Sequence, residues 1–263
     1  LREASITPSQ TESDLSRPRR HVLVLAEHDG HTLHASTRCL LSAARRLGDT
    51  ISLLVAGHAI APIANAASEI AGVNQVLMAD DPALAHRPEE PLAALLAQCA
   101  HQTAATVLLA ATSAQGKATL PRTAALLDCP MLSDIIAIDT PDTMAGPIHA
   151  GEALATWHNT SQVQILSLRP ASYPPAGQQV PALIQCVEMP HAGRHSHWIE
   201  QTRTHGEWPK LSEARIVVSG GSGLQSAEKF QTVIAPLASR LGAAIGATLS
   251  AVDAGFVDNA AQI

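Results

Sequence analysis

The chain has 263 residues, enough for two domains or one large one, and its 46% hydrophobic content supplies an ordinary core. Aromatic residues make up only 2% and the net charge is −6, so the chain offers few rings for stacking bases and no basic stripe, and nucleic acid is not an expected partner. No apolar run approaches the roughly 20 residues of a membrane span, and the polar opening lacks the apolar segment of a secretion signal, so we expect neither membrane insertion nor secretion.

Residues 1–20 are polar, carry Arg17, Arg19 and Arg20, and are predicted to be disordered. From His21 onward, apolar strand patterns alternate with helical periodicity. This alternation predicts a doubly wound, Rossmann-like α/β domain over residues 21–169. The predicted strands are 21–26, 51–55, 75–79 and 106–110, and the predicted helices are 36–47, 60–71 and 92–99.

After Asp134 the rhythm changes to short strands without helices between them, at 135–138, 153–158, 163–168 and 182–187. We expect these strands to pair as an antiparallel extension. Residues 170–212 are rich in Pro, Gly, His and Gln, and this composition predicts a linker between domains.

A new α/β unit begins near Ala214, where the strand pattern 215–219 runs into a glycine turn and then a helical pattern. Pro236 should kink or interrupt that helix. Glycines let the backbone approach a ligand closely, and a helix start offers free N–H groups to an anion, so this turn predicts a phosphate cradle. An ordinary strand-to-helix turn is the alternative. The turn is Gly220-Gly221-Ser222-Gly223, and the helix carries Phe230, Val233, Ile234, Leu237 and Leu241.

Other chemistry finds little support in the sequence. The loop 111–117 resembles a phosphate-binding loop only superficially, because Ala111 and Ala118 stand where that motif needs Gly and Ser or Thr. Lys117 and Arg122 are interpreted as solvated charges. No nucleophile elbow or paired carboxylates are found, so no catalytic residue is predicted.

Histidines and cysteines do not form a recognisable metal site. His191, His195, His197 and His205 crowd one stretch, but the nearest cysteine stands alone, so no metal is expected. His28, His31 and His34 are interpreted as a polar loop. The cysteines lie far apart without a Cys-x-x-Cys pair and are interpreted as reduced core thiols. They are Cys39, Cys99, Cys129 and Cys186.

Residues 214–223, 246–248 and 251–257 resemble the flavin domain of the electron-transfer flavoprotein alpha subunit family. Upstream blocks resemble that family's first domain in the same order, so the resemblance covers nearly everything from 21 to 263. It implies an α/β chain with a Rossmann-like first domain that holds no nucleotide, followed by the first part of a flavin-binding domain at 213–263. The upstream blocks are 25–28, 54–57, 114–122, 133–138 and 150–154.

The resemblance also implies a function. Members pair with a beta subunit, hold FAD chiefly on the second alpha domain, and carry electrons from dehydrogenases, such as those of fatty acid oxidation, to a membrane quinone reductase. The location would be the cytoplasm of a bacterium or the mitochondrial matrix. The resemblance assigns cofactor contacts to Gly220, Gly221, Ser222, Gly223, Thr248, Leu249 and Ile263.

Three of these positions depart from the family pattern. Ser222 and Leu249 stand where the family has arginines near the flavin, and Thr248 stands where it has a serine. A missing cation should lower the potential of a bound flavin. Ile263 reaches only the first position of the next contact loop, so we expect the chain to be a fragment that binds no stoichiometric FAD alone.

Two alternatives remain open. Ser222 and Leu249 favour a flavin-deficient fragment or paralogue that acts as a partner-binding scaffold. A nucleotide-binding protein of the universal-stress type, built on residues 21–169, is the other alternative, although its glycine-rich phosphate loop is missing.

Overall fold

The structure is a computed structural model that describes residues 20–86, 88–190, 198–200, 208–209, 211 and 214–263. The chain divides into two compact units, residues 1–198 and 199–263, called here the first and second units. The predicted disorder of residues 1–19 lies outside the described residues. Arg20 is described, and its guanidinium donates hydrogen bonds to the Pro141 carbonyl, at 2.8 Å, and to the Asp142 carboxylate.

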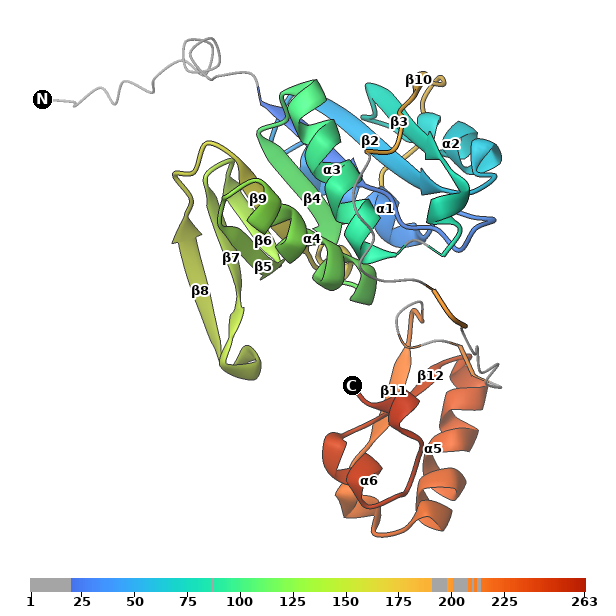
Figure 1. Cartoon of the computed structure of the whole chain (residues 1–263). Coiled ribbons are helices and arrows are strands. Elements are labelled where there is room, and N and C mark those ends of the chain that lie inside the picture. The colour runs from blue at the N-terminus through green and yellow to red at the C-terminus, as the bar shows by residue number, and fades with distance from the viewer. Residues whose placement is uncertain (1–19, 87, 191–197, 201–207, 210, 212–213) are drawn as a thin grey trace, which may run out of the picture. The chain divides into compact units, whose positions relative to one another are not determined.

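The first unit is built on a seven-stranded parallel sheet in the order β10-β3-β2-β1-β4-β9-β5 (Figure 1). Its central strands are mostly apolar, and β2 is buried from Ile51 to Gly57. Strands of a parallel sheet have this apolar character because helices cover both faces of the sheet. The strands are β1 (His21–Leu25), β2 (Thr50–Gly57), β3 (Gln75–Asp80), β4 (Val107–Ala111), β5 (Met131–Ile135), β9 (Gln164–Leu168) and β10 (Leu183–Cys186).

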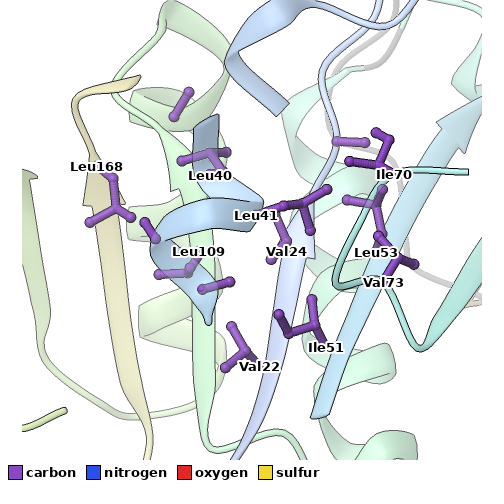
Figure 2. Close-up of a cluster of buried hydrophobic side chains, with 14 of the residues drawn as sticks. Val22, Val24, Leu40, Leu41, Ile51, Leu53, Ile70, Val73, Leu109 and Leu168 are labelled. Atoms are coloured by element: carbon purple, nitrogen blue, oxygen red, sulfur yellow. The ribbon is translucent and has the colours of Figure 1, made fainter. Parts of the chain in front are cut away.

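Helices α1 (Ala35–Ala44) and α2 (Ala61–Ser68) pack on one face of this sheet, and α3 (Glu89–Thr103) and α4 (Ala114–Leu126) pack on the other. Side chains alternate between the faces, so Val22 and Val24 lie in the cluster of α1 and α2 while Leu23 lies in that of α3 and α4. Figure 2 shows the first cluster, where Leu40 and Leu41 of α1 approach the sheet. This confirms the predicted doubly wound α/β fold.

Helix α4 was not predicted, because residues 111–117 were interpreted as a loop. It begins at Ala114, and the Ser113 hydroxyl caps it by accepting a hydrogen bond from the Gly116 N–H at 3.0 Å. The segment is rich in small residues and contains Pro121, which weakens its helical periodicity. The Ser113 cap was the local signal that could have found it.

The predicted antiparallel extension is partly wrong. An antiparallel sheet does form from β6 (Ala137–Thr140), β7 (Thr143–Ile148) and β8 (Ala153–His158), although β7 was not expected. β9 and β10 instead join the parallel sheet, β9 between β4 and β5, and β10 beside β3. Every residue of β9 is buried, so this strand needs two covered faces that an exposed extension does not provide.

The predicted linker, residues 170–212, contains ordered structure in its described part. Tyr173 is buried in the cluster of α1 and α2, and β10 pairs with β3. The remaining boundaries of the linker and of the second domain at 213 stay predictions.

The second unit contains two parallel strands, β11 (Val217–Gly220) and β12 (Ala244–Ala247), joined by α5 (Ala227–Leu241) and followed by α6 (Leu249–Asp253). Phe230 and Ile234 of α5 pack with Ala247 and Ala251 in its core. Of the predicted kink or interruption at Pro236, the interruption is wrong, because α5 runs unbroken through it, and the kink stays a prediction. The carbonyl of Thr232, which loses its usual donor, lies on an exposed side of the helix and can be hydrated.

Candidate functional site

The candidate site lies at the carboxyl ends of β11 and β12. Gly220 is in register with Ala247, and the Thr248 N–H donates to the Gly220 carbonyl at 3.0 Å. The two turns that follow these strands therefore meet at one edge of the sheet. In open parallel sheets this edge is where ligands bind.

The glycines of the first turn serve different purposes. A Cβ on Gly220 would lie 2.6 Å from the Phe230 ring, so Gly220 is required by packing. A Cβ on Gly221 would lie 3.4 Å from the Thr248 hydroxyl oxygen, and one on Gly223 would meet nothing within 4 Å. Among the four turn residues, Gly221 to Gly223 thus form the part that a ligand can approach.

The expected phosphate cradle is only partly formed, because the turn does not run directly into a helix. Residues 222–224 form a short 3-10 turn, and α5 begins later, at Ala227. The Ser226 hydroxyl caps α5 by accepting a hydrogen bond from the Lys229 N–H at 3.1 Å. One of the N–H groups expected to face an anion is therefore satisfied within the chain.

The second turn supplies exposed hydroxyl groups. The Thr248 and Ser250 hydroxyl oxygens lie 3.0 Å apart at the start of α6, and the Leu249 side chain is exposed. Ser250 was missed in the sequence, since one serine in a helix start carries no distinctive signal. Ile263 also reaches this region, because its N–H donates to the Ala247 carbonyl at 3.0 Å. The structure thus gathers all the predicted contact residues around the ends of two strands.

The charge of the site follows from these side chains. Ser222 and Leu249 are both exposed and bring no cation to it. Lys229 lies one helical turn beyond the Ser226 cap, and its ammonium donates to the Gln225 side-chain oxygen at 2.8 Å. Hydroxyl and backbone N–H groups can donate hydrogen bonds to the oxygens of a flavin or a phosphate, so the donors at this site fit such a group. The two turns supply no positive charge to it.

Comparison with known proteins bears on both units. Residues 22–188 match the family model described as electron transfer flavoprotein domain, and residues 210–263 match the model described as electron transfer flavoprotein FAD-binding domain. The chain belongs to the electron transfer flavoprotein alpha subunit family. The FAD-binding match contains every predicted cofactor contact, from Gly220 to Ile263.

Individual relatives agree with this family. The chain is 39% identical to the electron transfer flavoprotein subunit alpha of Pseudomonas aeruginosa over 243 residues, which cover 92% of this chain and 78% of the relative. It is 36% identical to the mitochondrial subunit alpha of Oryza sativa subsp. indica, with 100% of this chain and 78% of the relative covered. The subunit alpha of Bradyrhizobium diazoefficiens is 38% identical, with 92% and 76% covered.

Other predicted groups in this family member are placed as follows. Lys117 is exposed, and Arg122 pairs with Glu90 of α3, with nitrogen and oxygen 3.2 Å apart. The clustered histidines, His191, His195, His197 and His205, lie outside the described residues. Within the described ranges, no three His, Cys, Asp or Glu side chains are grouped to hold a metal ion, and no helix is long and apolar enough to cross a membrane.

Two sequence interpretations need correction. His28, His31 and His34 do lie in the loop between β1 and α1, and His31 is exposed, but His28 is buried and its Nε2 is hydrogen-bonded to the Ala56 carbonyl at 2.9 Å. The cysteines are not all core thiols. Cys99 is buried in α3, where burial raises its pKa to about 12, whereas Cys186 is exposed on the edge strand β10. An edge strand leaves alternate side chains in solvent, which a short apolar pattern does not reveal.

Proposed function

We propose that this chain is the alpha subunit of a heterodimeric electron-transfer flavoprotein. It holds FAD on its second unit together with a beta subunit, accepts electrons from dehydrogenases and passes them to a quinone reductase. One observation carries the proposal. The residues that match the FAD-binding family model include the two predicted contact turns, and these turns meet at the carboxyl ends of β11 and β12. Relatives from a bacterium and from mitochondria support a bacterial cytoplasmic or mitochondrial matrix location.

Each group at the strand edge has a task in this proposal. FAD supplies the electron-accepting chemistry when it is bound. The exposed backbone from Gly221 to Gly223 lets the cofactor approach the strand ends closely, and the Thr248 and Ser250 hydroxyls orient it by hydrogen bonds. Gly220 keeps Phe230 packed beneath the turn, which fixes the turn's position.

The test is co-expression of this chain with the beta-type subunit encoded in the same genome. We expect a heterodimer that carries flavin after gel filtration and is bleached when a flavin dehydrogenase and its substrate are added. Gly221→Val should lower the flavin content, because the added side chain would stand beside Thr248. Gly242→Asn is the matched control: Gly242 ends α5 in the left-handed conformation that Asn tolerates, with nothing within 4 Å of an added Cβ.

The second candidate function is a partner-binding scaffold without flavin. The uncharged Ser222 and Leu249 at the turns favour it, since neither offers a cation to a flavin ring. The same preparation separates the two functions. A stable heterodimer without flavin, even after refolding with excess FAD, would support the scaffold and overturn the electron carrier.

A further inference from the structure

The parallel sheet of the first unit has a switch point between β1 and β4. In the order β3-β2-β1-β4, the chain leaves β1 through α1 toward β2 and leaves β4 through α4 toward the opposite edge. The connections diverge between β1 and β4. In doubly wound sheets this switch point is where nucleotides bind, with phosphate at a helix start.

Glu27, just after β1, occupies this position. Its side chain is buried, with the residue only 4% exposed. One carboxylate oxygen accepts a hydrogen bond from the Ser113 hydroxyl, and the other accepts one from the Ser36 hydroxyl at 3.2 Å. Ser113 caps α4 and Ser36 lies in the first turn of α1, so one carboxylate is bound to the starts of both helices.

The contact to α4 runs through a relay. The Ser113 hydroxyl accepts the Gly116 N–H at 3.0 Å and donates its own hydrogen to Glu27. Close packing holds this turn in place, because a Cβ on Gly116 would lie 1.9 Å from the Ala111 carbonyl oxygen. The backbone of Glu27 is also fixed to α1, since its N–H donates to the Thr37 hydroxyl at 3.1 Å.

A buried carboxylate needs compensation, and here it does not come from a side-chain cation. Within the described residues, no Lys, Arg or His forms an ion pair with Glu27. The starts of α1, ten residues long, and of α4, thirteen residues long, both reach this carboxylate through Ser36 and Ser113, and a helix start carries the positive end of its dipole. These are the groups that would compensate a phosphate.

We propose that the Glu27 carboxylate is a built-in anion that takes the phosphate position of the first unit and closes its switch point to nucleotides. Removing the carboxylate then opens a site for inorganic phosphate or a nucleotide phosphate, lined by Ser36, Ser113 and the two helix starts. The inference concerns the first unit and is independent of flavin binding by the second.

The test compares the full chain with Glu27→Ala, using inorganic phosphate and AMP as probes, by calorimetric titration and phosphorus NMR. We expect Glu27→Ala to bind phosphate at least about tenfold more tightly than the wild type and to regain thermal stability as phosphate is added. Asp29→Ala is the matched control. It removes a carboxylate of equal charge two residues away, on an exposed turn, and should bind phosphate as the wild type does.

Equal phosphate affinity in the wild type and Glu27→Ala, or an equal gain in Asp29→Ala, would overturn the proposal. Phosphate binding to the second unit cancels in this comparison. If Glu27→Ala does not fold, Glu27→Gln keeps the shape and removes the charge, and a double-mutant cycle with Ser113→Ala measures the Ser113–Glu27 coupling. We expect Ser113→Ala to cost less stability in the Gln background than in the wild type, and equal costs would overturn the proposal.

Discussion

The Thr248 N–H donates a hydrogen bond to the Gly220 carbonyl, with nitrogen and oxygen 3.0 Å apart. This bond extends the β11–β12 pairing one residue past the end of β12 and ties the two turns of the candidate site together. A packing change under one turn is therefore transmitted to the other. Gly220 is the point where such a change can be made with one methyl group.

Gly220→Ala should destabilise the second unit by about 1–3 kcal/mol, because its Cβ would lie 2.6 Å from the buried Phe230 ring and 2.7 Å from the Leu224 side chain. Hydrogen exchange of peptides from β11 and β12 measures the loss. Faster exchange should appear in both strands, since Thr248 and Gly220 share a hydrogen bond.

Gly223→Ala is the control for this change. Nothing lies within 4 Å of its added Cβ and its backbone is not left-handed, so stability should stay within about 0.5 kcal/mol of the wild type. Equal losses in the two variants would show that the clash with Phe230 is not the cause.

The potential of the bound flavin is the second prediction, and it depends on the proposed function. Leu249→Arg should raise the potential, because a cation stabilises the charge gained on reduction and the exposed Leu249 position accepts a long side chain. A unit charge at 4 Å is worth up to about 4 kcal/mol at an effective dielectric of about 20, and 1.4 kcal/mol corresponds to roughly 30 mV for two electrons.

A shift of tens of millivolts is therefore expected in a redox titration of the heterodimer, and Ser222→Arg should act in the same direction. Leu249→Met, which changes shape without charge, is the matched control. A potential equal in the Arg and Met variants would rule out a flavin near Leu249.

The sequence predicted the parts of this fold that are governed by local patterns. β1 to β4 and α1 to α3 were found because their apolar periodicity is strong and depends only on residues close together in the chain. The partners of β9 and β10 could not be found in this way. β10 pairs with β3, more than a hundred residues earlier, and a four-residue strand carries no information about its partner.

The candidate sites show the same division. The glycine turn after β11 was visible as a composition signal, but the capping of α5 by Ser226 depends on where the helix begins, which periodicity locates poorly. The hydrogen bond between Glu27 and Ser113 joins residues 86 positions apart. Each residue alone looks ordinary in the sequence, so only the folded switch point reveals their relation.

The ionisation of Tyr173 gives a third prediction. Its side chain is buried, and its hydroxyl has no hydrogen-bond partner within the part of the chain that the structure describes. Burial raises its pKa from the ordinary value of 10 to about 12. Because the unfolded chain loses this proton first, the tyrosine's contribution to stability is intact below pH 10 and declines as pH rises toward 12.

Tyr173 is the chain's single tyrosine, so ultraviolet absorbance of tyrosinate reports its titration directly. We expect a midpoint near 12, and Tyr173→Phe should remove the decline in stability above pH 10. At neutral pH the Phe variant should be at least as stable as the wild type, since it removes an unpaired buried hydroxyl. A midpoint near 10 would mean that the ring is solvated.

Thiol reactivity gives the fourth prediction, because the cysteines differ in exposure. Cys186 is exposed on β10, whereas burial raises the pKa of Cys99 to about 12 and also raises the pKa values of Cys39 and Cys129. The thiolate is the reactive form, so at pH 8 iodoacetamide should modify Cys186 at least about tenfold faster than Cys99. Timed alkylation with peptide mass spectrometry measures the order of reaction, and Cys186→Ser should remove the fast phase.

Denaturant should make Cys99 react as fast as an exposed thiol, because its slow reaction in the folded chain comes from packing between α3 and the sheet. Modification of Cys99 as fast as Cys186 in the native chain would place α3 away from the sheet and contradict the fold of the first unit.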